Sequence, residues 1–172
     1  MNIDELKKDS SIENLKSIDN GGKAYKIINP NNSNEYIVLQ SMQKGAWNQG
    51  WGDGTYGKGL LAYRVSYPFN KVNVFDYPNN EKGKPRVIPI PADGKILAGK
   101  NATSYLEYVN QHNGDLYPYN RIDYISGFKM FNGSILEKSI VNIKENDGGD
   151  SNNNYVNFEF KNGLVPLSLI HI

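Results

Sequence analysis

Short runs in which apolar and polar residues alternate, separated by clusters of Gly, Pro, Asn and Asp, recur along this chain and predict β-strands joined by turns. The clearest run covers residues 155–161, where every second side chain from Val156 onward is apolar. Residues 139–145 precede it across an Asn/Asp/Gly-rich loop. We expect the two runs to form a hairpin with one buried and one solvated face.

Three further strands are predicted at residues 24–28, 35–42 and 60–67. In 35–42 the apolar side chains fall on both faces, which indicates a central strand of a sheet. A long glycine-rich loop, residues 43–58, separates it from the strand at 60–67.

The remaining segments are less regular. Prolines in and around residues 86–90 favour an edge strand, since proline lacks the N–H that a central strand donates. Residues 103–109 predict one helical turn, and we expect the rest of 95–134 to be loop.

The predicted fold is therefore mainly β, an antiparallel sheet or β-sandwich with a long Gly-rich loop and little helix. We expect residues 1–22 to be a flexible or short helical N-terminal segment and residues 23–163 a single β-rich domain. Residues 164–172 are expected to be an irregular C-terminal tail.

Composition excludes several classes of protein. The 172 residues suffice for one domain with a hydrophobic core. Nineteen basic against 18 acidic residues give a net charge of +1, which offers no electrostatic basis for binding nucleic acid or an anionic membrane. With no cysteine, disulfides and zinc thiolates are excluded. No apolar run approaches the roughly 20 residues that span a bilayer, and the N-terminus lacks the apolar segment of a signal peptide.

The glycine-rich loop carries the first candidate site. Its aromatic residues, Trp47, Trp51 and Tyr56, present flat faces on which a glycan or peptide could stack. Asn48 and Asp53 would supply polar contacts to such a ligand. The alternative is that both tryptophans fold back and cap the sheet.

The loop between the last two predicted strands carries the second candidate, a calcium site. Its oxygen donors are Asp147, Asp150 and Asn152, which are of the kinds that Ca²⁺ takes as ligands. A solvated hairpin loop is the alternative. The same two interpretations apply to Asp76, Asn79 and Asn80 in the earlier polar loop.

Catalytic constellations are not evident in the sequence. Zinc hydrolysis needs about three protein ligands, and the chain has two histidines, His112 and His171, far apart and outside any HExxH. We expect His112 to be an exposed turn residue. The carboxylates of Glu35, Asp53, Asp76 and Asp93 lie near predicted strand ends, where a glycosidase pair could meet, although with 18 acidic residues some proximity is expected by chance.

Five short segments occur in a fixed order across residues 23–161. They are EYIVL at 35–39, GKGLLAY at 57–63, PRV and PADG within 85–94, DLYP at 115–118, and SIVNIKEN with VNFEF within 139–160. In this order the chain resembles the part of immune inhibitor A-like secreted bacterial zinc metallopeptidases that follows the catalytic helix.

Two of these segments depart from the family pattern. Residues 40–43 are QSMQ where the family has ENRQ, and residues 63–66 are YRVS where it has WHID. The family's HExxH helix lies upstream of the matched region and is absent here.

The resemblance therefore implies a non-catalytic structural or substrate-binding module, which would partner a peptidase catalytic domain and be secreted or held at the cell envelope. Zinc would belong to an upstream catalytic region. Two alternatives remain open: a stand-alone module that binds a glycan or peptide, and a fragment of an intact secreted zinc peptidase.

Overall fold

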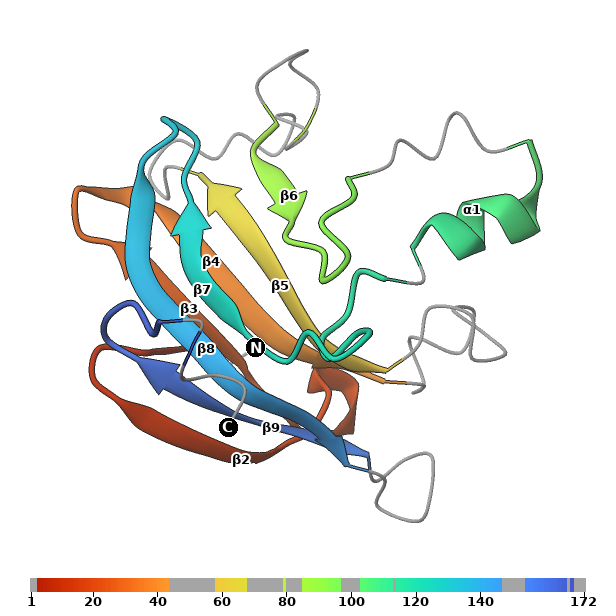
Figure 1. Cartoon of the computed structure of the whole chain (residues 1–172), viewed down its shortest axis with the longest axis horizontal. Helices are drawn as coiled ribbons and strands as arrows, with labels where there is room; N and C mark the ends of the chain where they lie inside the picture. The colour runs from red at the N-terminus through yellow and green to blue at the C-terminus, as the bar shows by residue number, and fades with distance from the viewer. Residues whose placement is uncertain are drawn as a thin grey trace.

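Two β-sheets lie face to face in the computed structural model, with their inner faces forming the core (Figure 1). The sheets are largely antiparallel, so the predicted fold class is confirmed. The structure describes residues 3–43, 58–67, 79, 85–96, 103–112, 114–146, 154–166 and 168.

The first sheet has five strands in the order β1-β3-β4-β5-β6. These strands are β1 (Ile3–Glu5), β3 (Ala24–Asn29), β4 (Asn32–Met42), β5 (Gly59–Ser66) and β6 (Val87–Pro89). Only the β1–β3 pairing in this sheet is parallel. The sheet contains the predicted strands of residues 24–28, 35–42 and 60–67, and β6 lies at its edge as the prolines indicated.

The second sheet has four strands in the order β2-β9-β8-β7. These strands are β2 (Ser10–Leu15), β7 (Ile125–Lys129), β8 (Ile135–Asn146) and β9 (Tyr155–Lys161). The pairing of β8 with β9 confirms the predicted hairpin.

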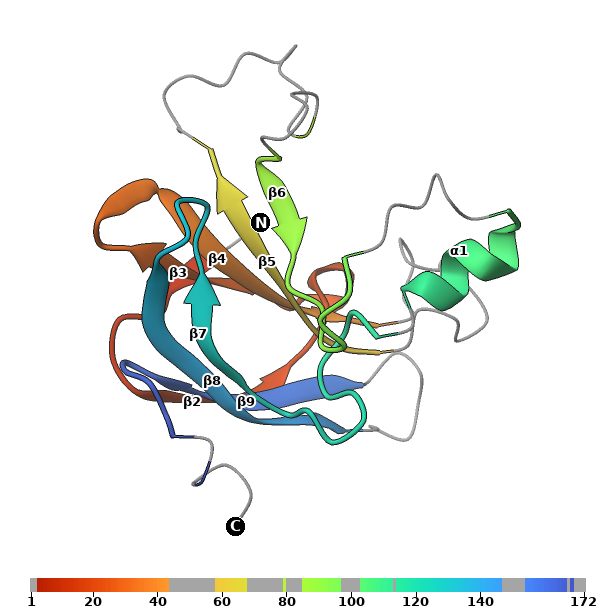
Figure 2. The same ribbon diagram turned by 45° about the horizontal axis from the view of Figure 1, so that its top comes forward.

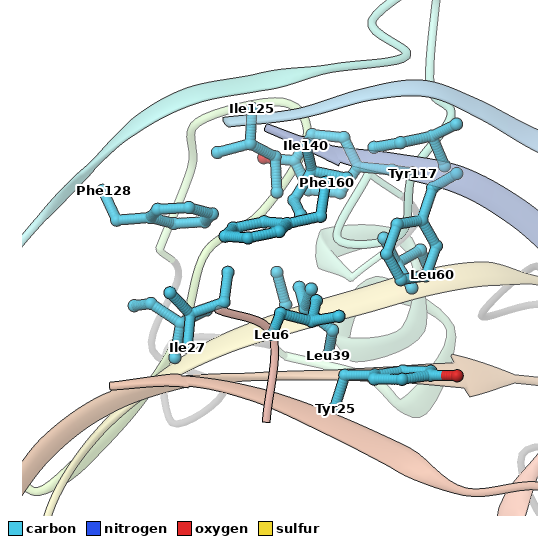
Figure 3. Packing of buried hydrophobic residues seen from close by; sticks show 14 of the residues in the cluster. Leu6, Tyr25, Ile27, Leu39, Leu60, Tyr117, Ile125, Phe128, Ile140 and Phe160 are labelled. Carbon is cyan, nitrogen blue, oxygen red and sulfur yellow. The ribbon is translucent and has the colours of Figure 1, made fainter. Parts of the chain in front are cut away.

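Alternation along each strand builds the core between the sheets. On β4, Ile37 and Leu39 are fully buried in this core, whereas Val38 belongs to a smaller cluster on the opposite face of the sheet. Figure 3 shows side chains of the first sheet below and aromatic rings of the second sheet above. Across the interface the Tyr25 and Phe158 rings meet edge to face, with centroids 6.1 Å apart.

The N-terminal residues form strands, so the short helix predicted within residues 1–22 is wrong. Strand β1 pairs with β3, and β2 pairs with β9, so the segment supplies an edge strand to both sheets. A short helix with few packed residues is marginal in water. The edges of β3 and β9 instead offer backbone N–H and C=O groups with which the N-terminal segment can pair. A 3-10 turn, Ile18–Asn20, connects β2 towards β3.

The segment between β6 and β8 is more regular than predicted. Helix α1 (Tyr105–Gln111) confirms the predicted helical turn, but β7 lies where we expected loop. No helix among the described residues is long and apolar enough to cross a membrane.

The described start of the predicted tail, residues 164–166, has no regular structure. It is nevertheless held on the second sheet, because the Ser126 hydroxyl donates to the Val165 carbonyl at 3.0 Å and the Val165 N–H donates to the Ser139 hydroxyl at 3.1 Å.

Candidate functional site

The predicted ligand-binding residues of the glycine-rich loop lie outside the described residues, as do the predicted calcium ligands. They are Trp47, Asn48, Trp51, Asp53 and Tyr56 in the first group and Asp147, Asp150 and Asn152 in the second. Both predictions stay predictions. The described residues instead show a groove that the sequence did not suggest.

The groove lies between the edge strand of each sheet. On one side are β6 and the residues that follow it, and on the other are β7 and the turn into β8 (Figure 2). Its volume is about 510 Å³. This lies within the range of about 300–1,000 Å³ that is usual for ligand pockets.

The walls of the groove are mainly apolar. Ile88, Ile90 and Ile96 line one side, and Phe131 lines the side of the β7–β8 turn. Ile96 is 63% exposed, so a large apolar surface faces the solvent here.

The charged residues in the described lining of the groove are both cationic. They are Arg64 and Lys129, and no lining residue that the structure describes is Asp or Glu. The groove therefore combines apolar walls with a local excess of positive charge.

Arg64 is held in a defined position. It faces inward from β5, opposite Ile37 in the register. Its Nη1 donates to the Lys129 carbonyl at 2.5 Å, and its Cζ lies 3.9 Å from the centroid of the Phe131 ring. Burial lowers the pKa of Arg64 and nearby Glu35 raises it, with burial dominant. Since the ordinary pKa of arginine is above 12, the side chain stays charged.

Glu35 lies behind this arrangement and is 3% exposed. One of its carboxylate oxygens accepts from Asn29 Nδ2 at 3.2 Å, and the other accepts from the Phe131 N–H. Glu35 and Arg64, on neighbouring strands of the first sheet, thus both hold the β7–β8 turn of the second.

Of the four carboxylates considered for a glycosidase pair, Asp53 and Asp76 lie outside the described residues, and the contacts of the other two are structural. Both oxygens of Glu35 are engaged, and the Asp93 carboxylate accepts from the Lys95 N–H at 2.9 Å within its own turn. Each carboxylate therefore has a local structural partner.

The outer edge of β6 is closed to strand pairing. The Asn79 side chain accepts from the Val87 N–H at 3.0 Å and donates to the Val87 carbonyl at 3.0 Å, as a neighbouring strand would. Pro89 and Pro91 have no N–H to offer. Asn79, considered above as a calcium ligand, is thus an edge cap.

His112 follows α1 in a turn, but the prediction that it is exposed is wrong. Its Nδ1 lies 2.8 Å from Asp115 Oδ2, and only 23% of its side chain is exposed. Burial raises the pKa of Asp115, an effect that His112 partly offsets. Within the described residues, no three His, Cys, Asp or Glu side chains gather where they could hold a metal ion.

A second hollow, of about 500 Å³, lies at the far end of β8. Its charges are mixed: Arg121 and Lys144 line it together with Asp123 and Glu145. Glu145 also pairs with Lys58, at 2.8 Å. The lining residues of this hollow that the structure describes carry no excess of either charge.

Comparisons with protein-family models, with curated proteins and with solved structures found no match for this chain.

Sequence reasoning missed the groove because its walls come from distant parts of the chain. In the sequence, Arg64 stands out only as part of the YRVS segment that departs from the family motif. Lys129 and Phe131 lie in a stretch predicted to be loop. The one local signal was the pair of apolar residues Ile88 and Ile90 on a strand already identified as an edge.

Proposed function

We propose that this chain is a non-catalytic β-sandwich module that binds an extended polypeptide segment in the groove between β6 and β7. This agrees with what the resemblance to the C-terminal portion of immune inhibitor A-like metallopeptidases implies. The observation that carries the proposal is the groove itself, about 510 Å³ in volume, with apolar walls at the open edge of the sandwich.

The spacing of the groove residues suits an extended chain. Ile88 and Ile90 are two residues apart on an extended segment, so their side chains lie on the same side about 6.6 Å apart. Alternate side chains of a bound extended peptide have the same spacing. Burying two such side chains supplies a hydrophobic driving force.

The walls also have few degrees of freedom. The Phe131 N–H is held by Glu35, and its ring is stacked with Arg64. A wall that is already ordered loses little conformational entropy on binding, which favours affinity for a given contact area.

The test uses fluorescein-labelled β-casein, an extended polypeptide, as the probe and measures fluorescence anisotropy. Ile96→Asp places a charge on an exposed wall residue and should weaken binding about 5-fold or more. Leu106→Asp is the matched control, since Leu106 is 62% exposed on α1, outside the groove. It should leave binding unchanged.

Circular dichroism of both variants verifies that they fold. If the wild type does not bind the probe, or if both variants bind it as the wild type does, the proposed function is wrong.

A further inference from the structure

We propose that the groove selects polypeptide segments that carry a carboxylate next to apolar side chains, with the carboxylate bound at Arg64 and Lys129. This inference rests on the proposed function and adds a ligand chemistry to it. The carboxylate could be the α-carboxylate of a chain end or the side chain of Asp or Glu.

The charge of the groove is the first support. The negative charge of Glu35 raises the pKa of Arg64, but Glu35 lies behind the guanidinium and is not among the described lining residues of the groove. Its carboxylate accepts hydrogen bonds from Asn29 and Phe131. Lys129 is exposed, and none of the ion pairs of the described residues involves it. One positive charge therefore remains without an acidic counterpart at the groove.

The state of Arg64 is the second support. The Nε atom of Arg64 is buried and has no hydrogen-bond partner, although Nη1 is bonded. Because Nε is shielded from solvent, a ligand would meet the other nitrogens of the guanidinium, where the bond to the Lys129 carbonyl is exposed. A carboxylate there would accept a charge-assisted hydrogen bond, which is stronger than a bond to a neutral amide oxygen.

The surroundings strengthen this attraction. Apolar walls at Ile88, Ile90 and Phe131 partly desolvate the cation, so its Coulomb interaction with an anion is less screened than at an open surface. The same desolvation is what lowers the pKa of Arg64. The negative charge of a bound carboxylate would offset the cost of desolvating the guanidinium, whereas a neutral amide would not.

The experiment compares three fluorescein-labelled hexapeptides by anisotropy. The first ends in Val-Ile-Val with a free α-carboxylate, the second is its C-terminal amide, and the third is an amide with Glu as its penultimate residue. We expect at least one carboxylate-bearing peptide to bind about 10-fold more tightly than the plain amide. Which of the two does so identifies the source of the carboxylate.

Variants then locate the carboxylate. Arg64→Gln should abolish the preference, but it also removes the contacts with Lys129 and Phe131 and could disturb the fold. Lys129→Gln changes an exposed side chain and should lower the preference about 3-fold. Lys8→Gln, which removes an exposed lysine outside the groove, is its matched control and should leave the preference intact.

The outcomes separate the two proposals. If all three peptides bind equally and Ile96→Asp weakens all of them, the carboxylate inference is wrong and the proposed function stands. If neither the peptides nor β-casein bind, both the proposed function and the carboxylate inference fail. A preference that survives Lys129→Gln, or that Lys8→Gln lowers equally, would also overturn the inference.

Discussion

Replacement of Glu35 by alanine tests the tie between the two sheets most directly. The substitution removes a carboxylate that is 3% exposed and accepts hydrogen bonds from Asn29 Nδ2 and the Phe131 N–H. The Asn29 amide loses its acceptor in a buried place and the Phe131 N–H loses its acceptor in a partly buried one, and Arg64 loses the neighbouring negative charge that stabilises it.

The expected loss follows from these three effects. Removing one member of a buried charged network costs about 3–5 kcal/mol, because the partners left behind stay desolvated. That is a large share of the total stability of about 5–15 kcal/mol that is usual for proteins. Glu35→Gln keeps the shape and one acceptor oxygen, so its loss should be smaller, about 1–3 kcal/mol.

Urea denaturation followed by circular dichroism measures this loss. With a slope of about 2 kcal/mol per molar urea, Glu35→Ala should lower the midpoint by about 1.5–2.5 M. Glu137→Ala is the control, since Glu137 is exposed on β8, and it should change stability by no more than about 0.5 kcal/mol. A Glu35→Ala midpoint no lower than that of the control would refute the reasoning.

Three other predictions follow from single contacts. Gly59→Ala should unfold the protein or cost about 3 kcal/mol or more in a urea titration, because the φ of Gly59 is +150° and a Cβ would lie 2.3 Å from the Tyr117 carbonyl oxygen. Asn79→Ala should speed hydrogen exchange of the Val87 amide, which loses its acceptor, and a rate equal to that of the wild type would contradict the edge cap. Burial raises the pKa of Asp115 above its ordinary 3.8, so the folded state binds this proton more tightly than the unfolded state does. The stability of the wild type relative to Asp115→Asn should therefore rise as the pH falls through the raised pKa and level off below about pH 3.8, whereas a pH-independent difference in urea midpoint would exclude this effect.

Strands with a regular alternation or a continuous apolar run could be predicted from the sequence, whereas β1, β2 and β7 could not. In β9 the buried positions are every second residue, as the sequence indicates. In β1 all residues are exposed, and in β2 only Leu15 is buried. The strand β7 has its register shifted around Gly127, whose φ is +76°. Such a bulge disrupts the period of two on which the prediction depends.

The groove could not be predicted because its contacts are long-range. Glu35 and Phe131 are 96 residues apart in the sequence, and Arg64 and Lys129 are 65 apart. No local pattern relates residues at such separations. The sequence does predict a buried strand that includes residue 35, but a glutamate at that position gains its role only once the second sheet packs over it.

The same contacts that join the sheets also shape the groove, and this links stability to binding. If Glu35 lay within the groove, it could still hold the β7–β8 turn. It would then repel the carboxylate of a ligand, however, because its negative charge would face that ligand. From behind Arg64 it stabilises the charged guanidinium and fixes Phe131, while the face of the groove keeps its positive charge. If the groove binds a polypeptide as proposed, the cost of ordering its walls is thus met on folding rather than on binding, which is how a rigid site gains affinity.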